Sequence, residues 1–136
     1  MENPTKIIDK VAYLKLVDGQ ILITRSKGKD KYYIPGGKRE GEESDEATLL
    51  REIKEELSVD ILPPSIRYIG TFSAQADGKA SGVQVQMTCY TADYEGELKA
   101  SHEIAEIDWF HYKDIDKVSH VDKIIFNYLR DEGSLT

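Results

Sequence analysis

The segment from Gly36 to Val59 constrains the fold of this chain more than any other. Apolar residues recur at helical spacing between positions 47 and 57, which predicts an amphipathic helix with one buried stripe. Ser44 stands where a side-chain hydroxyl would accept hydrogen bonds from the first-turn amides. A Pro-Gly-Gly turn precedes the helix, and its glycines leave room for a ligand to approach the backbone. The segment therefore predicts a turn followed by a helix that packs on a core.

The same helix has a second, acidic face. Glu52, Glu55 and Glu56 stand at i, i+3 and i+4, and at about 100° per residue their side chains share one arc. Like charges at this spacing destabilise an isolated helix, so a bound cation would stabilise it. Oxygen ligands suit Mg²⁺, with Mn²⁺ as the alternative. On helical spacing alone, a solvated acidic face explains the pattern equally well.

The spacing of the surrounding residues decides between these readings. Gly37 is followed by Glu43 and then by Arg-Glu-Ile-x-Glu-Glu at 51–56, with Val59 beyond. This pattern resembles the Nudix box, and six such identities coincide by chance on the order of once in ten million positions. Ser58 departs from it, because the family has a glycine there. A serine in a left-handed helix terminus would be strained by about 1 kcal/mol.

The resemblance implies a fold and a site. The fold would be α+β, a Nudix-like α/β/α sandwich with a curved mixed β-sheet, and residues 1–136 would form a single Nudix hydrolase domain. Arg51 would orient the glutamates, pairing with Glu43. Glu52 is the first candidate for the general base, because neighbouring acids would raise its pKa. The metal shell would consist of oxygen ligands from the Gly36 carbonyl, Glu52, Glu55, Glu56 and Glu103, and the catalytic groups would be Glu52, Glu55, Arg51 and Glu103.

Four further candidate residues lie outside the motif helix. Glu103 stands in a loop before a predicted strand. At this place MutT-type members supply an additional glutamate that binds metal or acts as the general base, and Glu106 is the alternative candidate for that role. Arg25, at a strand end, and Lys38, after the double glycine, are placed to bind phosphate oxygens. Solvated surface charge is the alternative for each of them. The three histidines show no ligand spacing and are assigned no chemistry.

Composition narrows the possible partners. The chain of 136 residues has 18 basic and 25 acidic side chains, a net charge of -7, so no basic field attracts a nucleic acid polymer. A single cysteine, Cys89, excludes an internal disulfide and fits a reducing compartment. No run approaches the roughly 20 apolar residues of a membrane span, and the N-terminal residues lack the apolar core typical of a signal peptide. We expect a cytoplasmic protein without a membrane partner, and an oligomer is not excluded.

Short β-prone runs surround the central helix. An Asp-Gly pair at 18–19 predicts a hairpin between Val11–Leu16 and Ile21–Thr24. Gly82–Ala92 alternates apolar and polar residues, as a half-buried antiparallel strand does. The other predicted elements are the strands Tyr32–Ile34, Ile66–Ala74 and Ile107–His111 and a closing helix at 121–129.

The leading functional hypothesis is a divalent-metal-dependent pyrophosphohydrolase of MutT type that acts on a nucleoside di- or triphosphate. Nucleotide sugars and dinucleoside polyphosphates are alternative substrates. A nucleotide-sensing module without catalysis is a hypothesis from a different class, and an isoprenoid diphosphate isomerase is a third. Substrate choice is expected to depend on the loops Ser26–Lys31 and Ala74–Ser81.

Overall fold

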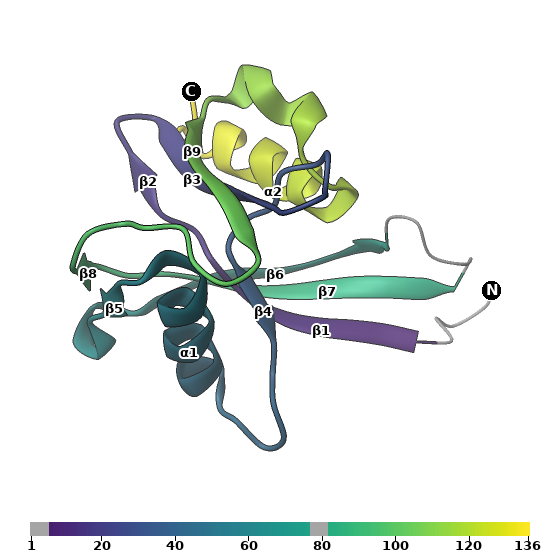
Figure 1. Ribbon diagram of the computed structural model, residues 1–136. Helices are drawn as coiled ribbons and strands as arrows, with labels where there is room; N and C mark the ends of the chain where they lie inside the picture. Colours follow the sequence, from purple (N-terminus) through teal and green to yellow (C-terminus); the bar gives the residue numbers. More distant parts are fainter. Residues whose placement is uncertain (1–5, 77–81) are drawn as a thin grey trace.

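The structure, a computed structural model, describes residues 6–76 and 82–136 (Figure 1). Residues 77–81 of the loop expected to select the substrate therefore lie outside the described residues. The elements in chain order are β1 (Lys6–Tyr13), β2 (Leu16–Val17), β3 (Gln20–Ser26), β4 (Gly36–Lys38), α1 (Asp45–Leu57), β5 (Asp60–Ile61), β6 (Arg67–Gln75), β7 (Val83–Thr91), β8 (Tyr94–Glu95), β9 (Ile104–Phe110) and α2 (His120–Asp131), with 3₁₀ turns at Pro63–Ser65 and Tyr112–Lys117.

The strands form a mixed sheet and an antiparallel sheet. The mixed sheet has the order β4-β1-β7-β6, in which β1 runs parallel to β7 and antiparallel to β4. The antiparallel sheet has the order β2-β3-β9, and β5 and β8 form a short pair of their own. This combination of mixed and antiparallel strands with helices confirms the predicted α+β fold class.

Strand β1 lies between the two helices. Successive side chains of a strand point to opposite faces, and in β1 Val11 packs with Leu49 of α1 whereas Ala12 packs with Ile125 of α2. Figure 1 accordingly shows α1 and α2 on opposite sides of the strands. Each face of β1 thus contributes to a separate apolar cluster, which gives the α/β/α layering.

The predicted hairpin is only partly correct. The turn at Asp18-Gly19 is present, but β2 and β3 pair over just two positions, Leu16 with Ile21 and Val17 with Gln20. The residues from Val11 to Tyr13 instead belong to β1 and pair with β4 and β7. The reason is tertiary: β7 lies more than 70 residues further along the chain, and a local turn signal carries no information about such a partner.

A second difference concerns the segment before α1. Tyr32–Ile34 is not a strand, since Tyr32 and Tyr33 make only isolated bridges. Gly36–Lys38 forms β4 instead, although glycine has a low strand propensity. A side chain at Gly36 is excluded, because its Cβ would lie 2.1 Å from the Val11 carbonyl oxygen, at a φ of +142°.

The remaining elements agree with the sequence. Helix α1 begins after Ser44, whose hydroxyl accepts a hydrogen bond from the Ala47 amide at 3.1 Å. It ends at Ser58, which has the left-handed φ of 64° expected where the family has glycine. In β7 the apolar side chains at 85, 87 and 89 are buried as predicted, but the strand is antiparallel only to β6 and parallel to β1. No helix in the described part of the chain is long and apolar enough to cross a membrane.

Candidate metal centre

A cavity of about 320 Å³ opens between the mixed sheet, the antiparallel sheet and α2. This is the size of a small-molecule site, for which about 300 to 1,000 Å³ is typical. Apolar residues such as Ile8, Ile34 and Met87 form part of its wall. Charged residues from separate elements also line it, namely Lys10, Glu56, Glu103 and Asp122, together with the double glycine of β4.

Glu56 is the buried carboxylate of the cavity wall. Its side chain is 93% buried, since only 7% of the residue is exposed, and its Oε1 accepts a hydrogen bond from the Gly36 amide at 3.2 Å. Burial, together with the charges of Glu52 and Glu103, raises the pKa of Glu56 to about 8 against the opposing effects of that hydrogen bond and of the Lys10 charge. A buried carboxylate is costly to ionise without a compensating charge. The position therefore calls for a cation.

Glu52 lies one helical turn before Glu56 and packs against the double glycine. A Cβ at Gly37 would lie 2.4 Å from the carboxyl carbon of Glu52, so glycine is needed for this close approach. Burial raises the pKa of Glu52, and the adjacent Arg51 guanidinium opposes the rise. The predicted direction is confirmed. Burial, however, contributes more than the neighbouring acids Glu55 and Glu103, to which the sequence argument attributed the shift.

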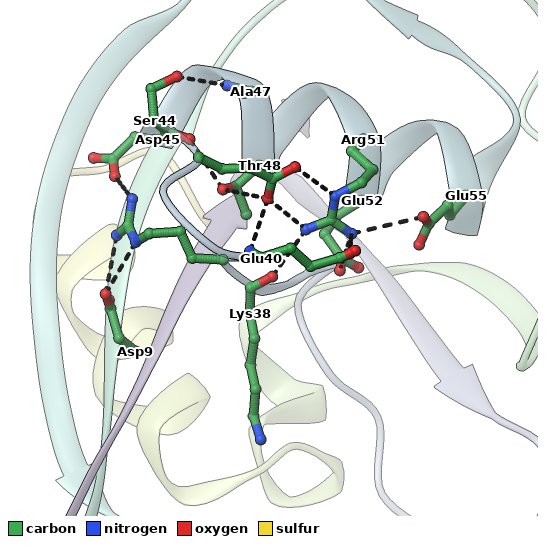
Figure 2. Close-up of polar contacts among 12 residues, drawn as sticks. Asp9, Lys38, Glu40, Ser44, Asp45, Ala47, Thr48, Arg51, Glu52 and Glu55 are labelled. Atoms are coloured by element: carbon green, nitrogen blue, oxygen red, sulfur yellow. Dashed lines mark hydrogen bonds and ion pairs between the residues drawn. The ribbon is translucent and has the colours of Figure 1, made fainter.

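Arg51 connects the helix to the segment before it (Figure 2). Its Nε and Nη2 donate to the two carboxylate oxygens of Glu43 at 2.8 and 2.7 Å, the forked geometry that the sequence suggested. Nη2 also donates to the Lys38 carbonyl at 3.0 Å, and Nη1 donates to Glu52 at 2.9 Å. The Arg51 contact lowers the pKa of Glu43 to about 2. Arg51 thereby holds β4, Glu43 and Glu52 in one arrangement.

Glu55 lies apart from the cavity although it belongs to the same acidic face. Its side chain is 42% exposed, and an oxygen lies 3.6 Å from Arg51 Nη1. One helical face therefore divides into an inner pair, Glu52 and Glu56, and an outer residue, Glu55. Helical spacing does not distinguish them, because the distinction depends on what packs against the helix.

Glu103 reaches the cavity from a loop that is bound to the end of α1. The amides of Lys99 and Ser101 donate to the carbonyls of Leu57 and Glu56 at 2.9 and 3.1 Å. His102 adopts a left-handed φ of 54°, and its Nδ1 lies 2.9 Å from the Glu55 carbonyl oxygen. A carbonyl can only accept, so this nitrogen donates. The loop thus satisfies carbonyl groups that a helix end leaves free.

Glu106 and Arg25 contact each other on another face. Arg25 Nε donates to Glu106 Oε1 at 3.2 Å, and the Tyr32 hydroxyl donates to the same carboxylate at 3.0 Å. Thr24 lines the cavity, whereas its neighbour Arg25 points to the opposite side of β3. Arg25 also donates to the Lys29 carbonyl at 3.1 Å, so the structure places it as a contact of the 26–31 loop.

Comparison with known proteins identifies the family. A family model described as NUDIX domain matches residues 9–129. The chain belongs to the Nudix family. A curated relative, the Nudix hydrolase YvcI of Bacillus subtilis (strain 168), is 28% identical over 102 residues, which are 74% of this chain and 64% of that protein. The chain thus matches just under two thirds of the length of that relative.

Solved structures support the same assignment. The solution structure of the E. coli ORF135 protein has a TM-score of 0.71 and 26% identity, and the match covers 92% of this chain and 91% of that one. The crystal structure of the MutT protein from Methanosarcina mazei Go1 has a TM-score of 0.76 and covers 98% of both chains. At 20% identity, the latter likeness concerns the fold alone. The MutT-type Nudix resemblance and the fold predicted from it are confirmed.

Two cavity residues of this Nudix domain were not recognised in the sequence. Lys10 follows Asp9 in β1 and precedes its buried end at Val11–Tyr13, and Asp122 is 99% buried, with 1% exposed, in α2. Asp122 Oδ2 accepts a hydrogen bond from the Ile34 amide at 3.0 Å. The sequence pattern could have indicated Asp122. It precedes Ile125 by three residues and Phe126 by four, so it stands on the apolar stripe of its helix.

The donor set fits a hard divalent ion, which Nudix hydrolases generally use. The ligands on offer are carboxylate and carbonyl oxygens, and within the described residues the buried acid Glu56 forms no ion pair. Within residues 6–76 and 82–136, no group of three acidic, histidine or cysteine side chains is arranged to hold an ion. Such a set is not required for Mg²⁺, which is commonly held by one or two carboxylates together with water and substrate phosphates.

Proposed function

We propose that this protein is a divalent-metal-dependent hydrolase of MutT type that cleaves a phosphoanhydride bond of a nucleoside di- or triphosphate. The observation that carries the proposal is the buried carboxylate of Glu56 in the wall of a ligand-sized cavity, beside the double glycine. Membership of the Nudix family supports it. The alternative substrates are nucleotide sugars and dinucleoside polyphosphates.

In this proposal the ligands of Mg²⁺, or alternatively Mn²⁺, come from two segments. When bound, the ion neutralises phosphate oxygens and lowers the pKa of water. Glu56 lines the cavity from α1 and Glu103 lines it from the loop, and the Glu52 carboxylate lies against Gly37. Glu55 supplies an outer carboxylate. The proposed ligands are the Gly36 carbonyl, Glu52, Glu55, Glu56 and Glu103.

Glu52 is the proposed general base. Its raised pKa brings the carboxylate closer to the range in which it can accept a proton near neutral pH. Arg51, at 2.9 Å, fixes the direction of the carboxylate. Water attacks phosphorus, the proton passes to the carboxylate, and the phosphoanhydride P–O bond breaks with its electrons leaving on the departing phosphate oxygen. Glu103 is the second candidate for the same role.

The shape of the cavity supports a nucleotide as the substrate. The lining combines the carboxylates of Glu56 and Glu103 with apolar residues such as Ile8, Val85 and Val121. A phosphate chain requires the first environment and a heterocyclic base the second. Arg25 and Lys38 remain the phosphate-binding candidates from the sequence, and the contact of Arg25 with Lys29 makes Lys38 the stronger of the two.

The test is a panel of canonical, oxidised and sugar-linked nucleotides with Mg²⁺, with Mn²⁺ and with EDTA. We expect release of phosphate or pyrophosphate that requires the metal and is lost in Glu56→Gln. Mass spectrometry of products formed in ¹⁸O-labelled water identifies the phosphorus that is attacked. Tight binding of a nucleotide without turnover of any panel member would overturn the proposal in favour of a sensing module.

A further inference from the structure

We propose that Lys10 and Lys38 form a paired anion site that holds a phosphate group of the substrate at the cavity. The inference deepens the proposed function and rests on it for the identity of the natural ligand. It assigns a role to Lys10, a residue with no place in the metal shell.

Register places the two ammonium groups on one face. Lys10 of β1 and Lys38 of β4 are direct partners in an antiparallel pair, and the Cβ atoms of such partners are about 4.5 to 5.5 Å apart. The next pair along, Val11 and Gly37, faces α1, where Gly37 contacts Glu52. Lys10 and Lys38 therefore project to the other face, and Lys10 lines the cavity there. Figure 2 shows Lys38 extending away from Arg51 and α1.

Neither lysine is neutralised by the part of the chain that the structure describes. Among residues 6–76 and 82–136, no carboxylate oxygen lies within 4.0 Å of either ammonium nitrogen. The contrast with Arg39, the next residue after Lys38, is direct: Arg39 contacts both Asp9 and Asp45 on the other side of the sheet. Like charges directly opposite each other destabilise a sheet. An anion between Lys10 and Lys38 would relieve this repulsion.

The surroundings favour a phosphate as that anion. The chain has a net charge of -7, and Glu56 and Glu103 line the same cavity, so an anionic substrate needs a local attraction. Lysine binds phosphate as a compact point charge. Lys10 is close enough to Glu56 to lower its pKa, which places this ammonium beside the proposed metal ligands. One phosphate group of the substrate would bind the metal ion held by the carboxylates, and the adjacent phosphate group would contact both lysines.

The test compares Lys10→Gln, Lys38→Gln and the double variant with Lys6→Gln. Lys6 is a matched control because it lies in the same strand on the same face, opposite Val83 and not opposite a cation. The first measurement is the thermal midpoint with and without inorganic pyrophosphate at constant Mg²⁺. Without pyrophosphate, we expect Lys10→Gln to melt no lower than the parent. With pyrophosphate, its stabilisation should be smaller than that of the parent, while Lys6→Gln behaves as the parent does.

The second measurement is steady-state turnover of the best nucleotide. A hydrogen bond to a charged group contributes about 1.5 to 3 kcal/mol, so losing one lysine should raise KM by about 10- to 100-fold. We expect kcat to change much less, because ground state and transition state lose the same contact. The KM increase in the double variant should be smaller than the product of the single increases, since both lysines contact one group.

The outcomes separate this inference from the proposed function. If no nucleotide is turned over but Lys10→Gln still weakens pyrophosphate binding, the proposed function fails and the anion site stands. If nucleotides are turned over and Lys10→Gln matches the parent in KM and in pyrophosphate binding, the anion site is overturned. Weaker Mn²⁺ binding in Lys10→Gln with unchanged pyrophosphate binding would also overturn it, because Lys10 would then serve as a counter-ion of the carboxylates.

Discussion

Helix α1 and the loop from Lys99 to Glu103 both bring carboxylates to the cavity, but they hold them by different means. In α1 the backbone hydrogen bonds of a capped helix determine where Glu52 and Glu56 lie. Glu103 depends on contacts between two segments, the hydrogen bonds from Lys99, Ser101 and His102 to the end of α1. The helix holds its carboxylates rigidly, whereas the position of Glu103 depends on how the loop packs against the helix.

The two carboxylates are fixed in position to different degrees. Glu56 is buried and held at a backbone amide, so a change there removes a carboxylate from a fixed position. Glu103 comes from a less regular segment whose position can adjust. We therefore expect the two carboxylates to differ in their importance for turnover, and substitutions at the contact between loop and helix to affect Glu103 alone.

The largest expected effect is that of Glu56→Gln on turnover. Substitution of a residue that contacts a metal ligand typically lowers metal affinity or activity by about 10- to 100-fold. Loss of a proposed ligand itself should therefore lower kcat by more than about 100-fold. Glu103→Gln should cause a smaller loss. Steady-state kinetics at saturating Mg²⁺, with circular dichroism as the control for folding, measure the difference. A loss in Glu103→Gln equal to or greater than that in Glu56→Gln would contradict the proposed ranking.

The second effect is on stability against pH in the absence of metal. Burial raises the pKa of Glu56 from its ordinary value of 4.5 to about 8, so the folded state favours the neutral acid. The free energy of unfolding should therefore fall as the pH rises through the window between these values. One pKa unit corresponds to about 1.4 kcal/mol, so the fall should be on the order of 2 kcal/mol or more.

Urea denaturation in EDTA at pH 5.5 and pH 8.5 measures this fall in the free energy of unfolding. The pKa window of about 4.5 to 8 sets these two pH values. Glu56→Gln should lose most of the decrease, and Glu103→Gln, which keeps Glu56, should retain it. Mg²⁺ should stabilise the parent more at the higher pH, because the ionised carboxylate is the form that binds a cation. A parent protein as stable at the higher pH as at the lower would show that Glu56 ionises without cost.

The third effect tests the loop through His102. His102→Ala removes the hydrogen bond to the Glu55 carbonyl and leaves a left-handed residue that alanine tolerates poorly. We expect turnover to fall by about 10-fold, at the lower end of the range for residues that position metal ligands. His102→Asn should recover part of it, because asparagine tolerates this conformation and its amide can donate.

A double-mutant cycle distinguishes positioning from general destabilisation. In the Glu103→Gln background, His102→Ala should cause little further loss, since the group that His102 positions is already absent. Mn²⁺ affinity provides a readout independent of turnover, and it should follow the same pattern. Fully additive losses in the cycle would show that His102 acts on the fold and not through Glu103.

The smallest expected effect is at Ser58, where helix and loop meet. Ser58→Gly relieves a left-handed strain of about 1 kcal/mol. It also removes the hydrogen bond from Ser58 Oγ to the Lys99 carbonyl at 3.1 Å, a contribution of similar size. Urea denaturation should therefore show little net change. Ser58→Ala loses the bond and keeps the strain, so it should be less stable than the parent by about 1 kcal/mol.

The acidic helix could be predicted from the sequence because its geometry is local. An apolar stripe, an N-cap serine and glutamates at i, i+3 and i+4 depend only on the helical repeat. The structure confirms α1 with Ser44 as its cap and Ser58 in the left-handed conformation. The spacing of the Nudix box is also local, so the family can be recognised from the sequence alone.

The tertiary structure decided which of these groups face the cavity. Glu56 is buried whereas the side chain of the adjacent Glu55 is 42% exposed, because Glu56 lies on the side of α1 where its carboxylate meets the Gly36 amide of β4. Arg25 pairs with Glu106 on another face, whereas Lys10 lines the cavity. Strand register and sheet neighbours depend on residues far apart in the chain. The sequence by itself therefore determined the helix, the family and the type of ligands, and only the packing of distant strands determined which charges share one cavity.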